Sequence, residues 1–213
     1  MIYDVDGNKL SVDSGRLLSK KIAIVGDSYV SGTYENQESD MWWYKIADRN
    51  DMTAVNLGVG GESLRAMVQN ARYTNIPSDS DYIVIFEGHN DVSYDHTDIG
   101  TSADTGNTTF YGCLDILCKW LMNNRPTARK LFITPTHRGD NATVVQYVDA
   151  MKEVCYRYGI PCWDAYGNLD ILIGGANGVD QRSVFETSNL QYHLNALGQD
   201  YLSYKAEEQL RML

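Results

Sequence analysis

The sequence predicts a three-layer α/β/α domain around a five-stranded, mainly parallel sheet. Two observations lead to this fold class. Short apolar runs rich in β-branched residues alternate along the chain with longer segments that repeat at helical spacing. Each apolar run is also followed by glycine or polar residues, as strands are before a turn. Alternating strands and helices imply parallel pairing, because each helix carries the chain back across the sheet.

The strands are expected in the short apolar runs. Five segments are predicted as strands: 22–25, 53–57, 82–86, 130–134 and 160–163. The cleanest run is Tyr82-Ile83-Val84-Ile85-Phe86. Pro161 cannot donate a hydrogen bond to a neighbouring strand, so the last segment is expected at an edge of the sheet.

The helices are expected in the segments between the strands. They are predicted over 41–49, 62–73, 112–124, 141–157 and from residue 195 onward. In the second of these, Leu64, Met67 and Val68 share one face. Gly159 is expected to end the fourth as a C-cap. Residues 164–192 are expected to be irregular, with a weak helical pattern near 168–173.

Two further segments bear on domain organisation. Residues 1–20 lie outside the alternation and are expected to form an N-terminal extension or a short hairpin, before a single domain over 21–213. The length of 213 residues favours one domain, at roughly 150 residues per domain. Residues 92–111 are polar and are expected to form a loop of a length that is often functional.

Charge and composition exclude several classes of partner. With 28 acidic and 18 basic residues the net charge is −10, so we expect no nucleic-acid partner. No apolar run is long enough to span a membrane, and the first residues lack the apolar segment of a signal peptide. We therefore expect a cytoplasmic protein or a piece of a larger secreted or phage-associated one. The oligomeric state is left open.

Cysteine spacing argues against a metal centre. Cys113, Cys118, Cys155 and Cys162 include no CxxC pair, and no histidine lies at finger spacing. We expect these cysteines to be small buried apolar side chains. Neither a metal nor an organic cofactor is expected.

Reactive residue types collect after the predicted strands and before the last helix. Ser28 follows the first strand, Gly60-Gly61 the second and Asn90 the third, while His193 precedes the last helix. A serine hydroxyl becomes a nucleophile when an imidazole accepts its proton. The resulting oxyanion needs donors, which the Ser28 and Gly61 N–H groups and the Asn90 amide can supply. Together these residues predict acyl transfer.

These blocks resemble the SGNH, or GDSL-type, serine hydrolases over most of residues 21–213. Gly26-Asp27-Ser28-Tyr29 resembles the nucleophile block, with Tyr29 in place of the usual Leu or Ile, and Asn56-Leu57-Gly58-Val59-Gly60-Gly61 resembles the glycine block. Gly88-His89-Asn90-Asp91 resembles the GxND block, and His193-Leu194-Asn195 the catalytic histidine block. The resemblance implies the flavodoxin-like fold of that family, Ser28 and His193 as catalytic residues, and Ser28, Gly61 and Asn90 as the oxyanion hole.

One position departs from the family pattern. The family usually places Asp three residues before the catalytic histidine, and this chain has Leu190 there. A backbone carbonyl then orients His193, or Glu186 or Asn189 does so, or the chain is a weakened relative that serves as a carbohydrate-binding or structural module. A flavodoxin-like nucleotide binder is a more distant alternative, because no P-loop is present.

The substrate and the remaining polar residues are assigned more coarsely. Substrate contacts are expected from Tyr29, His89 and His137, while Asp91 is expected to cap the segment that follows it. The polar loop, if it lies near the site, favours a short acyl group, such as acetyl, on a hydrophilic carrier such as a carbohydrate. The stretch before Lys20 also resembles the lead-in of bacterial and phage-encoded members of the family.

Overall fold

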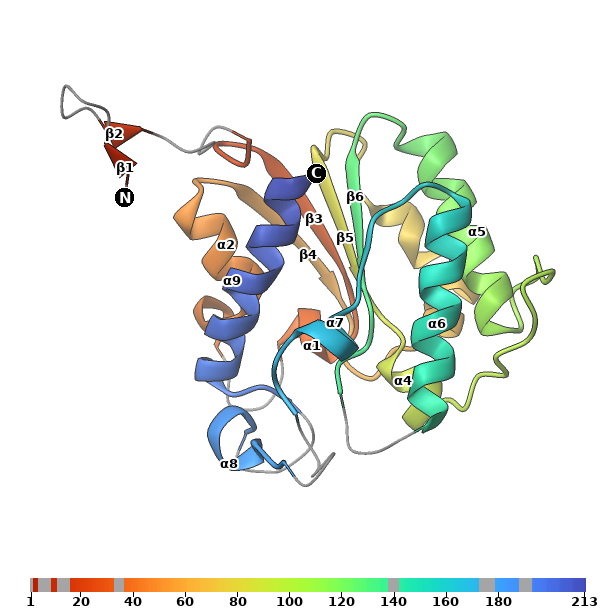
Figure 1. Ribbon diagram of the computed structural model, residues 1–213. Helices are drawn as coiled ribbons and strands as arrows, with labels where there is room; N and C mark the ends of the chain where they lie inside the picture. Colours follow the sequence, from red (N-terminus) through yellow and green to blue (C-terminus); the bar gives the residue numbers. More distant parts are fainter. Residues whose placement is uncertain are drawn as a thin grey trace.

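The computed structural model describes residues 2–3, 9–10, 16–32, 37–137, 142–172, 179–187 and 193–213. Its centre is a five-stranded sheet in the order β4-β3-β5-β6-β7 (Figure 1). The strands are β3 (Lys21–Gly26), β4 (Thr53–Gly58), β5 (Tyr82–Phe86), β6 (Arg129–Ile133) and β7 (Cys162–Trp163). All neighbouring pairs are parallel, which confirms the predicted fold class. β7 lies at an edge, as Pro161 predicts.

Helices connect and flank these strands. They are α1 (Ser28–Ser31), α2 (Trp42–Arg49), α3 (Leu64–Gln69), α4 (His89–Ser93), α5 (Phe110–Asn124), α6 (Ala142–Arg157), α7 (Ala165–Asn168), α8 (Arg182–Phe185) and α9 (Ala196–Met212), with 3₁₀ turns η1 (Glu38–Asp40) and η2 (Arg72–Asn75). A separate antiparallel pair joins β1 (Ile2–Tyr3) to β2 (Lys9–Leu10). Over the described ranges, no helix combines the length and the apolar character needed to cross a membrane.

The sheet is covered on both faces, which makes three layers. α2 and α9 lie on one side and α5 and α6 on the other (Figure 1). Side chains of β5 alternate between the two resulting cores: Ile83 and Ile85 pack with α3, α5 and α6, whereas Val84 and Phe86 pack with α2 and α9. Burying each such side chain contributes roughly 1.5–3 kcal/mol, so the two cores hold the sheet rigidly.

Two helices differ from the sequence-based prediction. The helix expected over 62–73 ends at Gln69, because Ala71 adopts a left-handed conformation with φ of +52° before η2 begins. The weak helix expected near 168–173 lies instead over Ala165–Asn168, where the Asp164 side chain caps it. Residues 173–178 lie outside the described part of the chain.

The loop expected over 92–111 is shorter than predicted, because α4 ends at Ser93 and α5 begins at Phe110. Thr109 caps α5 by accepting the N–H of Gly112. Inside the loop, the carbonyl of Ser102 accepts a hydrogen bond from Arg157, the last residue of α6. α6 begins near the carboxyl end of β6 and runs back along the sheet. Its last residue, Arg157, therefore lies toward the amino ends of the strands, away from the carboxyl ends that carry Ser28. Part of the loop therefore leads away from the predicted site.

Candidate active site

Ser28 lies at the turn where β3 ends and α1 begins, at the carboxyl edge of the sheet. The preceding Asp27 caps this short helix, since its Oδ1 accepts the backbone N–H of Tyr29 at 2.8 Å. The turn requires glycine at position 26, where a Cβ would lie 2.3 Å from the carbonyl oxygen of Phe86. Ser28 is 9% exposed, so its hydroxyl is held in a largely desolvated position.

His193 reaches this hydroxyl from the other end of the chain. Its Nε2 lies 2.7 Å from Ser28 Oγ. The His193 carbonyl accepts the N–H of Thr187 at 2.9 Å, and an antiparallel bridge joins Glu186 to Leu194. When Nε2 is unprotonated, the Ser28 hydroxyl donates to it, which is the arrangement that allows an imidazole to take the hydroxyl proton.

The predicted oxyanion donors follow the two strands that neighbour β3. Gly61 lies after β4 with φ of +78°, and a Cβ there would have nothing within 4 Å. Asn90 lies in α4 directly after β5, and its Nδ2 donates to the Glu62 carbonyl oxygen at 2.8 Å. The structure therefore brings Ser28, Gly61 and Asn90 to one edge of the sheet.

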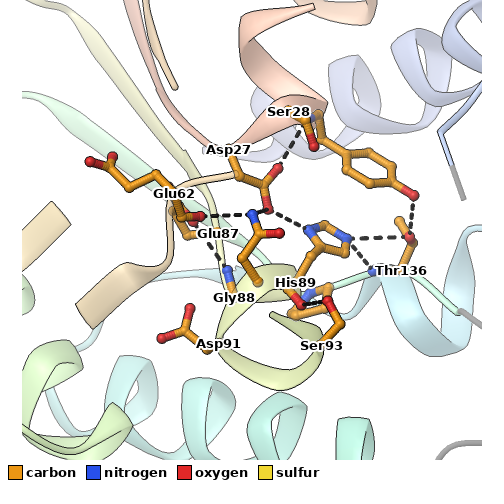
Figure 2. Close-up of polar contacts among 12 residues, drawn as sticks. Asp27, Ser28, Glu62, Glu87, Gly88, His89, Asp91, Ser93 and Thr136 are labelled. Carbon is orange, nitrogen blue, oxygen red and sulfur yellow. Dashed lines mark hydrogen bonds and ion pairs between the residues drawn. The ribbon is translucent and has the colours of Figure 1, made fainter. Parts of the chain in front are cut away.

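A buried hydrogen-bonded chain adjoins Ser28 (Figure 2). Asp27 Oδ2 lies 3.0 Å from His89 Nδ1, with the two side chains 0% and 1% exposed. His89 Nε2 accepts the backbone N–H of Thr136 at 3.0 Å, so the ring is neutral and its Nδ1 proton is donated to Asp27. The hydroxyl of Thr136 donates to that of Tyr29 at 3.1 Å. This chain ties together the ends of β3, β5 and β6.

The three residues expected to contact substrate are all buried. Tyr29 and His89 stack with ring centroids 4.2 Å apart, and their burial leaves almost no surface for a substrate in this structure. His137 follows β6 and stacks on Tyr166 at 4.5 Å. Its Nδ1 has no hydrogen-bond partner among the described residues. His137 therefore carries a buried polar atom that no described residue satisfies, and its expected contact with substrate stays a prediction.

Two acidic side chains are buried next to this network. Burial, followed by the charges of Asp27, Asp91 and Glu62, raises the pKa of Glu87 well above its ordinary value. Burial likewise raises the pKa of Asp91 to about 6. The Asp91 carboxylate also accepts the N–H groups of Leu64 at 2.7 Å and Arg65 at 3.3 Å. Asp91 therefore caps α3, which precedes it, and not the segment after it as expected, where, among the described residues, its carboxylate accepts only the hydroxyl of Thr97 at 2.8 Å.

The residues expected to orient the imidazole of His193 are described only in part. Glu186 is 6% exposed and its backbone pairs with Leu194, next to His193. Asn189 and Leu190 lie outside the described residues. Within the described ranges, no group of three or more His, Cys, Asp or Glu side chains is arranged to hold a metal ion.

Three residues at the site were missed by the sequence analysis. Thr136 follows β6, and its position at a strand end was a usable signal. Glu62 directly follows Gly61, which was a second one. Arg72 donates to the carboxylate of Glu62 at 2.6–2.9 Å. No sequence pattern indicates that pair, because it depends on the left-handed turn at Ala71.

The parallel sheet defines an α/β protein, with serine, histidine and asparagine side chains gathered at the carboxyl ends of its strands. The family model of GDSL-like lipases and acylhydrolases matches residues 24–201. The chain belongs to that family, as the four sequence blocks predict.

Solved structures agree with the assignment of the fold. A protein from Lactobacillus plantarum is 26% identical with a TM-score of 0.80, over 92% of this chain and 98% of that one. A lipase/acylhydrolase from Enterococcus faecalis is 17% identical with a TM-score of 0.67, over 91% and 96%. A variant of an acetyl-xylooligosaccharide esterase from Geobacillus is 16% identical with a TM-score of 0.64, over 92% and 96%. No curated protein sequence matches this chain.

Proposed function

We propose that this protein is a serine ester hydrolase in which Ser28 is the nucleophile and His193 the general base. The observation that carries the proposal is the 2.7 Å contact between Ser28 Oγ and His193 Nε2. As Ser28 attacks the acyl carbon, its proton moves to His193, which then returns it to the leaving alcohol oxygen. Water activated by the same imidazole then hydrolyses the acyl-enzyme and releases Ser28.

The oxyanion of each tetrahedral intermediate is stabilised in this proposal by three donors. The Ser28 N–H lies in the first turn of α1, where N–H groups have no partner within the helix. The Gly61 N–H is the second donor. The third is Asn90 Nδ2, which carries two hydrogens and donates one of them to the carbonyl of Glu62. Its other hydrogen is directed at Asp27 Oδ2 across a long contact of 3.5 Å, and it must turn from there to reach the oxyanion.

For the substrate, we propose a short acyl group, acetyl in the first instance, on a hydrophilic carrier such as a carbohydrate. The support is the fold likeness to a protein named as an acetyl-xylooligosaccharide esterase. The polar loop gives less support than expected, because Ser102 contacts the far end of α6. Rates on p-nitrophenyl acetate, butyrate and octanoate, beside release of acetate from acetylated xylo-oligosaccharides, test this assignment. A preference for octanoate would contradict it.

The rival function is a carbohydrate-binding or structural module on the same fold, which Leu190 favours because the usual acid is absent. The two functions are separated by a fluorophosphonate probe, which reacts with an activated serine. Covalent labelling that disappears in Ser28→Ala supports the enzyme. A folded protein that binds oligosaccharide but takes up no probe at Ser28 supports the module.

A further inference from the structure

Arg72 bridges the two ends of the glycine loop, residues 58–61, which begins at the last residue of β4. Its guanidinium donates through Nη2 to the carbonyl oxygen of Leu57 at 3.0 Å, just before the loop. It also donates through Nε and Nη2 to the carboxylate of Glu62, just after the loop, with the shortest distance 2.6 Å. Residues 58–61, which include Gly61, lie between these two attachment points.

The first half of the loop is anchored, since Gly58 pairs with Gly26 in the sheet and the Val59 N–H donates to the Gly26 carbonyl oxygen at 2.8 Å. Among the described residues, the backbones of Gly60 and Gly61 have no hydrogen-bond partner. Three of the loop's four residues are glycine, which is the residue with the most backbone freedom. Gly61 lies in the left-handed region and has no neighbour within 4 Å of where a Cβ would be. The direction of its N–H is therefore set by what holds the flanking residues.

Glu62 is anchored at three points. Its backbone N–H donates to Val59 O at 3.1 Å, and its carbonyl accepts Asn90 Nδ2 at 2.8 Å. Its carboxylate takes the guanidinium of Arg72, and that ion pair is well shielded, with the Glu62 side chain 7% and the Arg72 side chain 25% exposed. Forked, charge-assisted hydrogen bonds of this kind fix geometry more tightly than a point charge does. Glu62 thus joins the Gly61 peptide to the Asn90 amide.

We propose that Arg72 and Glu62 are positioning residues for the oxyanion hole. They hold the Gly61 N–H and the Asn90 side-chain amide at fixed positions relative to each other. The inference rests on the proposed function, because it concerns the same oxyanion. The early end of α3 serves this arrangement: the left-handed Ala71 turns the chain so that Arg72 points back to the loop.

The test compares Arg72→Ala, Arg72→Lys and Glu62→Gln with the wild type on p-nitrophenyl acetate. We expect kcat to fall roughly 10- to 100-fold while KM stays within about threefold, because the misplaced donors act mainly in the transition state. Arg72→Lys keeps the charge but loses the fork, so it is expected to fall nearly as far as Arg72→Ala. Guanidinium ion at millimolar concentration is expected to restore part of the kcat of Arg72→Ala.

The matched control is Arg49→Ala. Arg49 pairs with Glu207 at 2.7 Å with similar exposure, 28% and 11%, but joins α2 to α9 away from the loop. This control should lower the melting temperature without the selective loss of kcat. Equal loss of kcat in the control, or wild-type kcat in both folded Arg72 variants, overturns the inference.

A second readout needs no substrate, so it separates this inference from the proposed function. The ¹⁵N order parameters of the Gly60 and Gly61 amides are expected to drop from about 0.85 toward 0.6 in Arg72→Ala, and to stay unchanged in Arg49→Ala. Unchanged order parameters in Arg72→Ala overturn the positioning role of Arg72 and Glu62, even if the enzyme is active. If the order parameters drop but the protein shows no Ser28-dependent hydrolysis, the positioning role of Arg72 and Glu62 is supported and the proposed function is contradicted.

Discussion

Ser28 Oγ and His193 Nε2 lie 2.7 Å apart although 165 positions separate the two residues in the chain. The contact exists because β3 ends at the same edge of the sheet where the chain enters α9. Ser28 is fixed by the capped turn of α1, and His193 by backbone pairing with Thr187. Both partners are thus held by backbone structure, which fixes their geometry as the proposed catalysis requires.

Replacement of Asn90 by alanine should slow the chemical step without unfolding the protein. If Asn90 Nδ2 donates to the oxyanion, kcat is expected to fall about 10²–10³-fold. Steady-state rates on p-nitrophenyl acetate, together with a melting curve, measure this. A fall of less than about threefold in a folded variant would remove Asn90 from the oxyanion hole.

Loss of the His89 ring should destabilise the fold. His89→Ala removes the donor that lies 3.0 Å from the buried Asp27 carboxylate, and loss of a hydrogen bond to a charged group costs roughly 1.5–3 kcal/mol. Urea unfolding at pH 7 measures the free energy of unfolding. His89→Gln, which retains a donor, is the control and should lose less. A loss below about 1 kcal/mol for His89→Ala would show that the Asp27–His89 contact is energetically minor.

The raised pKa of Asp91 predicts how stability depends on pH. Burial moves this pKa from 3.8 to about 6, so between these values the folded state binds the proton more tightly than the unfolded state. The free energy of unfolding should therefore fall as pH rises from about 4 to 6, by up to roughly 3 kcal/mol from this group. The loss from Asp91 levels off above about pH 7, where its carboxyl is ionised in the folded state too.

Two measurements check the Asp91 prediction. A ¹³C NMR titration should show its carboxyl with a midpoint near 6. Unfolding curves for Asp91→Asn should have a flatter pH dependence between 4 and 6 than those of the wild type. A midpoint near 3.8, or parallel curves for the two proteins, would contradict the desolvation account.

Much of the fold was predictable because apolar periodicity reports burial directly. β5 is buried along its whole length, and its uninterrupted run Tyr82–Phe86 was read with both ends correct. The order of strands and helices then implied parallel pairing. By contrast, the end of α3 was misplaced, because a left-handed alanine at position 71 has no sequence signature. Short helices such as α7 depend on one cap, at Asp164, and are equally hard to place.

Some residues of the candidate site could be predicted from the sequence, and others could not. Ser28, Gly61, Asn90 and His193 carry recognisable spacing at strand ends and before a helix, so sequence patterns locate them. The side chains that hold these residues in place have no such recognisable spacing. Arg72 reaches Glu62 across α3, and His89 reaches Asp27 between the ends of β5 and β3, and no local pattern indicates either pair. What orients His193 also escapes prediction from the family pattern, since position 190 is leucine.

The most direct test of the central claim is hydrolysis of p-nitrophenyl acetate by the wild type, Ser28→Ala and His193→Ala, each shown to be folded by its melting curve. The wild type is expected to turn over the ester, and both variants to be slower by at least about 10³-fold, because the two residues act as one unit. Equal rates in the wild type and the two folded variants would contradict the Ser28–His193 mechanism.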